Sequence, residues 1–244
     1  MTMTTSGDRA RGDASGDDAP DRDVVVAIDG PAGSGKSTVA RAVAERTGLR
    51  HLDTGSTYRA LTLALLRRGT PIDDQEAIAE AAASVAVGLE LDPRPAGGSR
   101  VLLGGEPVST ELLRSPEVNA AVSAVSAVPA VRRRLVALQR SVMAAGGVVA
   151  EGRDIGTVVW PDAEVKVFLT ASADERARRR HGADGGAESA EQVARRDHLD
   201  SSRAASPTRP SDQALVLDST DRPVDEVVDE IVRLVETARA RRAR

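Results

Sequence analysis

The segment VVVAIDGPAGSGKSTVARAVAERTG, residues 24–48, decides the fold of this chain. It opens with a short apolar run that is typical of a parallel strand buried on both faces. GPAGSGKS then matches the pattern G-x-x-x-x-G-K-S/T, and the next residues place Val39 and Val43 on one face of a helix that Gly48 ends as a left-handed cap. A strand, a glycine loop and a helix in this order predict a phosphate-binding loop.

This loop predicts a site for the phosphates of ATP. Its glycines let backbone N–H groups point at phosphate oxygens, and the helix that begins near Lys36 adds its positive end. We expect Lys36 to reach the β- and γ-phosphates as a catalytic residue, and Ser37 to offer its hydroxyl to Mg²⁺ as the metal ligand. Lysine occurs only at positions 36 and 166, which indicates that the compact ammonium is needed in the loop. The predicted ATP-binding residues are Gly30, Pro31, Ala32, Gly33, Ser34, Gly35, Lys36, Ser37 and Thr38.

Four further apolar runs resemble buried strands, and helical segments lie between them. The runs are residues 50–53, 147–152, 165–170 and 214–219. Five such strands with crossovers predict an α/β fold, a five-stranded parallel sheet with helices on both faces. Residues 223–242 form an amphipathic helix with acids at its start and arginines at its end, which complements its dipole.

Two intervals look inserted into this core. Residues about 70–145 hold two short strand-like pieces and a helical stretch through 118–140, enough for a small substrate-binding subdomain. Residues about 176–205 contain a Gly/Ala-rich stretch edged with arginines, which indicates a mobile lid. Residues 1–23 lack any apolar run and predict a disordered tail before a single domain at 24–244.

Composition excludes several classes of function. The chain has 244 residues, a net charge of −4, three aromatic residues and no cysteine. Disulfides and cysteine-based metal sites are therefore excluded, and the three histidines are too dispersed to suggest a zinc site. An acidic chain with so few aromatics lacks the usual features of a nucleic-acid partner. No signal peptide or membrane-length apolar run is found, so we expect a cytoplasmic protein.

The loop alone leaves the reaction open. A GTPase needs an N-K-x-D sequence, and neither Lys36 nor Lys166 follows an asparagine. A regulatory ATPase usually has an Asp-Glu pair at the end of an apolar strand, whereas here Glu151 is followed by Gly152. This weakens a P-loop regulatory ATPase or a nucleotide switch without small-molecule acceptor, which stays as the alternative function.

Three clusters downstream of the loop indicate the class of enzyme. They are LDTGSTYRA at 52–60, EGRDIGTVVWPDA at 151–163 and RRDHLDSSR at 195–203. With the loop, they resemble the bacterial cytidylate (CMP/dCMP) kinase family from about Val24 to the C-terminal helix. The resemblance implies a P-loop nucleoside monophosphate kinase fold with an NMP-binding insertion and a lid. It also implies Mg²⁺-assisted, in-line phosphoryl transfer from ATP to CMP or dCMP by a monomer.

The resemblance also assigns the acceptor site. It implies that Arg59, Arg153 and Arg203 bind the α-phosphate of the acceptor and are catalytic. Guanidinium groups suit this task, because negative charge spreads over the transferred phosphoryl group during the reaction. By resemblance, Asp154 accepts from the cytosine amino group, Arg132 donates to the ring acceptors, and Ser123 supports them. The implied CMP-binding residues are Thr54, Tyr58, Arg59, Ser123, Arg132, Arg153, Asp154, Arg196, Asp200 and Arg203.

Some assignments stay open at this point. Ser126 competes with Ser123, because the repeated VSA pattern permits a register slip. Tyr58 has two interpretations, stacking near the base or packing in the core. The arginines of the predicted lid either bind the ATP phosphates or only lie on the surface of a helix; they are Arg176, Arg179 and Arg180.

Overall fold

A computed structural model describes residues 23–183 and 208–244 of the chain. The predicted tail, apart from Asp23, lies outside these residues, and so does the predicted lid beyond Ala183.

The five predicted apolar runs form one parallel sheet. Its strands are β1 (Val25–Asp29), β2 (Arg50–Asp53), β6 (Val148–Gly152), β7 (Val165–Thr170) and β8 (Leu215–Asp218). They lie in the order β2-β6-β1-β7-β8, and every neighbouring pair is parallel. The predicted α/β fold with a doubly wound sheet is therefore confirmed.

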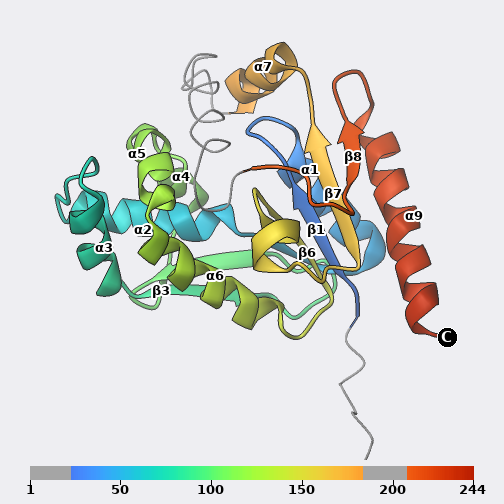
Figure 1. The fold of residues 1–244 in the computed structure, drawn as a ribbon, viewed down its shortest axis with the longest axis horizontal. Coiled ribbons are helices and arrows are strands. Elements are labelled where there is room, and N and C mark those ends of the chain that lie inside the picture. Colours follow the sequence, from blue (N-terminus) through green and yellow to red (C-terminus); the bar gives the residue numbers. More distant parts are fainter. Residues whose placement is uncertain (1–22, 184–207) are drawn as a thin grey trace, which may run out of the picture.

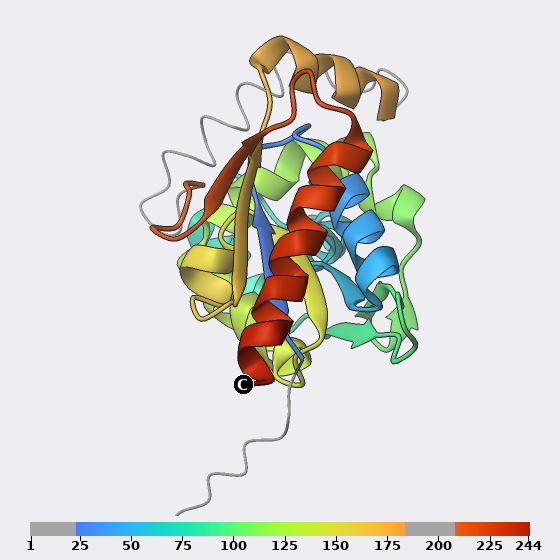
Figure 2. The same cartoon turned by 90° about the vertical axis from the view of Figure 1, so that its right-hand side faces the viewer.

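Apolar side chains cover both faces of the sheet, because successive side chains of a strand point to opposite faces and every residue of β1 is buried. On one face, Val26 and Ile28 of β1 pack with α1 (Lys36–Thr47) and α9 (Val224–Arg242). Figure 2 shows α9 lying along this face. On the other face, Val25 and Ala27 pack against α6 (Pro129–Met143) and the π-helical turn η1 (Ile155–Val159). Both helix layers thus fix the central strand from which the glycine loop begins.

The interval of about 70–145 forms a separate layer beside the sheet (Figure 1). It contains a three-stranded sheet in the order β3-β4-β5, with antiparallel pairs. Its elements, with the preceding α2, are α2 (Gly55–Arg67), α3 (Gln75–Ala83), β3 (Val87–Leu91), β4 (Ser99–Leu103), β5 (Glu106–Pro107), α4 (Thr110–Leu113), α5 (Pro116–Ala127) and α6 (Pro129–Met143). Side chains of α2, α3, α5 and α6 share one apolar cluster, so this layer packs as a unit.

The helical stretch predicted through 118–140 is two helices. Val128 has an extended backbone at φ −71° and ψ 120°, and it lies between α5 and α6. Pro129 causes the break, because proline lacks an N–H donor and disfavours a helical residue before it. The break turns α6 back across the sheet.

The connections at the carboxyl ends of the strands position the site. The chain passes from β6 to β7 through η1, a π-helical turn at Ile155–Val159, and from β7 into α7 (Ala173–Ala183). In open parallel sheets, ligands bind at the carboxyl edge where the strand order reverses, and here that edge holds the glycine loop. Within the described part of the chain, no helix combines the length and the apolar character needed to cross a membrane.

Candidate active site

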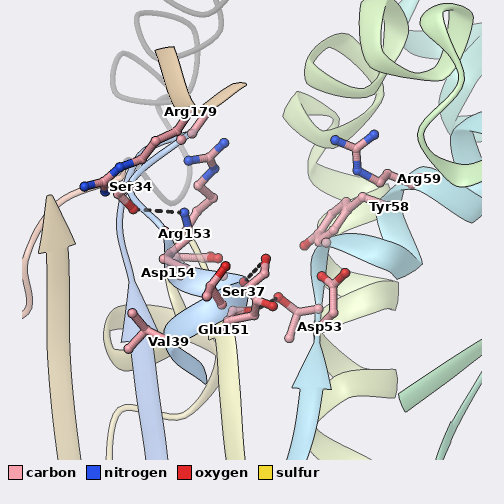
Figure 3. Close-up of a pocket in the computed structure, with 18 of the residues that line it drawn as sticks. Ser34, Ser37, Val39, Asp53, Tyr58, Arg59, Glu151, Arg153, Asp154 and Arg179 are labelled. Carbon is pink, nitrogen blue, oxygen red and sulfur yellow. Dashed lines mark hydrogen bonds between the residues drawn. The ribbon is translucent and has the colours of Figure 1, made fainter. Parts of the chain in front are cut away.

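A cavity of ≈ 500 Å³ opens at the carboxyl edge of the sheet. It is lined by the glycine loop, by the start of α2, by α5 and α6, and by the residues that follow β6 and β8. Figure 3 shows Tyr58 and Arg59 on one wall and Arg153 and Arg179 on the opposite wall. A ligand in this cavity would therefore contact elements that lie far apart in the sequence.

Two glycines of the loop are required by close packing. Gly30 has φ +151°, and a Cβ there would lie 2.0 Å from the carbonyl oxygen of Leu169. Gly33 has φ +74°, and its Cβ would lie 2.5 Å from the carbonyl oxygen of Arg176. Any side chain at either position would force the loop away from β7 or α7, so the path of the loop depends on glycine.

Lys36 and Ser37 begin α1 and face the cavity. The Lys36 ammonium donates to the carbonyl oxygen of Pro31 at 2.6 Å, which folds the side chain over the loop. The Ser37 hydroxyl donates to Glu151 Oε2 at 2.7 Å. Backbone amides at the start of a helix, an ammonium and a hydroxyl together form a site for a phosphate with its cation.

Glu151, at the end of β6, lies in a buried network beneath the loop. Its other oxygen, Oε1, lies 3.0 Å from His51 Nε2. Burial disfavours the Glu151 carboxylate, but the hydrogen bonds from His51 and Ser37 and the charge of Lys36 outweigh it, so the pKa of Glu151 lies below its usual value. Glu151 is therefore held as an anion next to the loop.

Asp53 ends the neighbouring strand β2, directly beside Glu151 in the register of the sheet. Burial, followed by repulsion from Glu151, raises the pKa of Asp53 above its usual value. The two carboxylates and the Ser37 hydroxyl place oxygen atoms at one edge of the cavity. Hard divalent cations such as Mg²⁺ take oxygen ligands and retain several waters, so these residues fit such a cation. In residues 23–183 and 208–244, no group of three or more His, Cys, Asp or Glu side chains is placed to hold a metal ion.

The two residues assigned to the base lie together. Arg132 Nη2 pairs with Asp154 Oδ2, and both side chains are buried. The Arg132 guanidinium also lies 5.5 Å from the centroid of the Tyr58 ring. Tyr58 is buried in the apolar cluster of the insertion and also lines the cavity, so it packs in the core, while its stacking near the base stays a prediction.

Ser123 and Ser126 lie on the same face of α5, and both line the cavity. The Ser126 hydroxyl donates to the Ser123 carbonyl oxygen at 3.2 Å. No hydrogen bond joins the Ser123 hydroxyl to another of the residues that the structure describes. This difference favours Ser123 over Ser126 as the group open to a ligand.

Arg59 and Arg153, which are predicted to bind the acceptor phosphate, are held by hydrogen bonds to other parts of the chain. Arg59 donates to Asn119 Oδ1 at 2.6 Å and to the Leu113 carbonyl at 3.0 Å, which fixes it between α2 and α5. Arg153 donates to the Gly30 carbonyl at 2.8 Å, across the sheet edge. Both guanidinium groups are therefore oriented by contacts within the protein.

Arginines of α7 fasten this helix to the loop and to the end of β8. Arg176 donates to the Ala32 carbonyl at 3.3 Å. Arg179 donates to Ser219 Oγ at 2.9 Å and to the Ser219 carbonyl at 2.6 Å. Arg179 lines the cavity, and Arg222, Val224 and Val227 extend the same wall.

The lining is strongly cationic although the chain is acidic overall. Among the described lining residues, seven are cationic: Lys36, Arg59, Arg114, Arg132, Arg153, Arg179 and Arg222. Three are carboxylates: Asp53, Glu151 and Asp154. A concave surface with this excess of positive charge concentrates anions, so the cavity suits a phosphorylated ligand or two of them.

The structure brings most of the predicted site residues to one cavity. The predicted residues that line it are Ala32, Gly33, Ser34, Gly35, Lys36, Ser37, Thr38, Thr54, Tyr58, Arg59, Ser123, Arg132, Arg153 and Asp154. Gly30 and Pro31 are absent from the described lining and instead accept hydrogen bonds through their carbonyl groups. Arg196, Asp200 and Arg203 lie outside the described residues, as does the side chain of Arg180.

Sequence reasoning did not assign several lining residues. Asp53 and Glu151 end adjacent strands, and this position at a strand end was the available signal. Arg114 and Arg222 lie in segments without a motif, and only the fold brings them to the cavity.

Comparisons with known proteins agree with this geometry. The family described as "Cytidylate kinase" matches residues 26–237. A protein of Mycolicibacterium paratuberculosis named cytidylate kinase is 52% identical over 221 residues, which cover 87% of this chain and 95% of that protein. A cytidylate kinase of Symbiobacterium thermophilum is 51% identical over 220 residues, with coverage of 87% and 96%. A "Bifunctional pantoate ligase/cytidylate kinase" of Synechococcus is 48% identical over 228 residues, which cover 91% of this chain and 42% of that protein.

Proposed function

The chain belongs to the cytidylate kinase family, and from this premise we propose how it phosphorylates CMP and dCMP with ATP. The γ-phosphoryl group of ATP moves to a phosphate oxygen of the acceptor, giving ADP and CDP or dCDP. The observation that carries the proposal is that the glycine loop and the Arg132–Asp154 pair line one cavity of ≈ 500 Å³. Donor and acceptor can thus meet without a covalent intermediate on the protein.

The glycine loop would hold the donor phosphates. Its amides and the start of α1 stabilise the negative charge, and the Lys36 ammonium exchanges the Pro31 carbonyl for β- and γ-phosphate oxygens. Support comes from the position of Lys36, which already lies over the loop at the cavity wall.

Ser37, Asp53 and Glu151 would hold Mg²⁺. The ion supplies charge neutralisation of the phosphates as they react. The Ser37 hydroxyl would bind it, while Glu151 orients that hydroxyl and, with Asp53, binds water around the ion.

Arg59 and Arg153 would hold the acceptor phosphate between the two walls. They lie on opposite sides of the cavity in Figure 3, and each is oriented by a carbonyl contact. Arg203 would add a third guanidinium by similarity to the family. The acceptor oxygen is already anionic, so no protein base is needed and catalysis rests on positioning and positive charge.

Asp154 and Arg132 would read the base. Their pairing places an acceptor beside a donor, which matches the cytosine N4 amino group beside the N3 and O2 acceptors. Arg132 Nε is buried and has no hydrogen-bond partner among the described residues, so the guanidinium retains donor capacity. Uracil presents an acceptor in place of N4, which would face the Asp154 carboxylate unfavourably. Ser123 would support the base from α5, while Thr54, Tyr58, Arg196 and Asp200 complete the acceptor site.

We also propose that the adenine of ATP contacts the wall formed by Ser219, Arg222, Val224 and Val227. This wall combines apolar side chains with a guanidinium, and both groups suit the face of a purine. We further expect a monomer, as the resemblance to the family implies, that works in the cytoplasm and, given its acidic composition with few aromatic residues, has no nucleic-acid partner.

An ADP-release assay with ATP and Mg²⁺ tests the function. CMP, dCMP, UMP, AMP, GMP and shikimate are supplied one at a time, and CMP and dCMP should be the best acceptors. Equal turnover without an acceptor would support a regulatory ATPase, and a preference for a purine nucleotide would contradict cytidylate kinase activity. The density of acceptor arginines argues against a nucleotide switch, which has no need of them.

A further inference from the structure

Residues 153–156 lie across the carboxyl end of β1. In the sheet, β1 lies between β6 and β7, so the chain that leaves β6 must pass the end of β1 before it enters β7. The register places Asp29 of β1 directly beside Gly152 of β6. The residues that follow these two positions are the glycine loop on one side and Arg153 and Asp154 on the other.

The Asp29 carboxylate bonds to two consecutive amides in this crossing segment. Oδ1 accepts from the Ile155 amide at 2.7 Å, and Oδ2 accepts from the Gly156 amide at 2.7 Å. The next residue, Gly30, accepts from the Arg153 guanidinium at 2.8 Å. Three hydrogen bonds therefore join residues 29–30 to residues 153–156.

A carboxylate suits this position because the two amides begin η1. The first amides of a helical turn lack partners within the helix. A carboxylate offers one acceptor oxygen to each of them, whereas an asparagine would turn an amide donor toward one N–H. Asp29 is only 5% exposed and is not among the described residues that line the cavity, so its partners are the backbone amides and not a ligand.

We propose that Asp29 is a positioning residue that holds Arg153 and Asp154 at a fixed distance from the glycine loop. It touches no reacting atom in this role, which rests on the proposed function above. Because Asp29 directly precedes Gly30, any displacement of residues 153–156 changes the separation of the acceptor from the donor phosphates. Small errors in that separation slow phosphoryl transfer strongly.

The raised pKa of Asp29 agrees with a role in positioning residues 153–156. Burial raises its pKa to about 6, although the two amide bonds act in the opposite direction. The charged groups that affect it are Asp154, which raises this pKa, and Lys36, which lowers it. A carboxylate whose pKa is raised in this way lowers the stability of the fold near neutral pH, so its contacts with the two amides are the evident reason for its position.

The variant Asp29→Asn tests the proposal. It keeps the volume of the side chain but removes one of the two acceptor contacts. We expect kcat with CMP to fall about 100-fold and the preference for CMP over UMP to fall about 10-fold. The Kd of MgATP should stay within about threefold, because the loop amides and Lys36 remain. A merely structural role would weaken both sites together and leave the CMP/UMP ratio unchanged.

Asp23→Asn is the matched control. It makes the same change next to the other end of β1, where Asp23 pairs with Arg239 and bonds the Val24 amide, remote from the cavity. This variant should retain the wild-type CMP/UMP ratio. An unchanged ratio and kcat in Asp29→Asn would overturn the proposal.

Hydrogen exchange of the wild-type chain provides a second measurement if Asp29→Asn fails to fold. The Ile155 and Gly156 amides should exchange as slowly as that of Ala150 in β6. Exchange as fast as that of Gly105, in the exposed turn between β4 and β5, would overturn the proposal. If wild-type protein does not phosphorylate CMP, the proposed function fails instead, so the two failures are distinguishable.

Discussion

In the proposed site, Asp154 would determine the preference for cytosine over uracil, and its exchange to Asn tests this role. Asparagine can present an amide donor to uracil O4 and loses its charge toward the cytosine amino group. We expect the ratio of kcat/KM for CMP to that for UMP to fall about 10- to 100-fold, since a polar pair contributes roughly 1–3 kcal/mol of discrimination. Steady-state kinetics with both acceptors measure this.

Asp162→Asn serves as the control for this variant. Asp162 is exposed eight positions further on and is not among the described residues that line the cavity. The Kd of MgATP should be nearly unchanged in both variants. A CMP/UMP ratio in Asp154→Asn that equals the ratio of the control would refute the assignment of the base.

The raised pKa of Asp29 also leads us to expect a specific dependence of the free energy of unfolding on pH. Its pKa is raised from 3.8 to about 6, so its contribution to stability is fully present below 3.8 and is lost as the pH rises through 6. Between pH 7.5 and pH 5, the free energy of unfolding of the wild type should rise by roughly 1 kcal/mol relative to Asp29→Asn. Urea unfolding of both proteins at the two pH values measures this difference. The same pH dependence in both proteins would show that Asp29 is not the group concerned.

Four features of single residues show which parts of the site could be predicted from the sequence and which could not. The glycine loop was predictable because its spacing alone describes a phosphate site, and Ser123 was preferred to Ser126 without a means to separate them. In the sequence, Glu151 served only as evidence against an ATPase, because Gly152 follows it. In the fold, it accepts a hydrogen bond from Ser37, which lies 114 positions away in the sequence. Asp29 reads as the end of a strand, and its bonds to the amides of residues 155 and 156 depend on the strand order.

At the scale of elements, glycines near the two ends of α1 have different roles: one permits close packing, and the other only permits a left-handed backbone. Gly33 before the helix and Gly48 after it have φ of +74° and +72°. A Cβ at Gly48 meets no atom within 4 Å, whereas one at Gly33 meets the backbone of α7. Gly48→Ala should therefore lower the free energy of unfolding by about 1 kcal/mol and leave kcat within about twofold.

Gly33→Ala should have a larger effect than its counterpart at position 48. The loop must move away from α7, so we expect the Kd of MgATP to rise more than about tenfold in addition to the loss of stability. Urea unfolding and titration of MgATP on the two variants give the comparison. Equal ATP affinities in both would contradict a requirement for close packing between loop and helix.

The elements themselves were largely predictable, because five apolar runs of strand length are typical of a parallel sheet that helices cover on both faces. Residues 118–140 are helical as predicted, but Pro129 divides them into two helices. The angle between α5 and α6 places α6 over the sheet. The Arg132–Asp154 pair follows from that angle, since one residue lies on α6 and the other follows β6. Helical periodicity carries no information on the angle between successive helices.

At the scale of the whole molecule, binding of either substrate should stabilise the fold. A ligand at about 100 times its Kd adds roughly 2.7 kcal/mol to the free energy of unfolding. For a chain of this length, that energy corresponds to an increase in Tm of about 5–10 °C. CMP alone and MgATP alone should each give such an increase, because the acceptor and donor residues are already oriented in the structure. Differential scanning fluorimetry measures both.

The same measurement separates the two halves of the cavity. At equal concentrations, UMP should raise the Tm less than CMP, because its O4 would face the Asp154 carboxylate in the proposed site. In Asp154→Asn, the CMP increase should shrink and the MgATP increase should persist. Within residues 23–183 and 208–244, the side chains of Asp154 and Arg132 bond to each other and to the Ser126 carbonyl, and no hydrogen bond joins them to the donor loop. Loss of both increases would instead mean that the variant disturbs the whole cavity. Specificity would then be a property of the assembled cavity, and the donor loop and base site would not be separable by a single substitution.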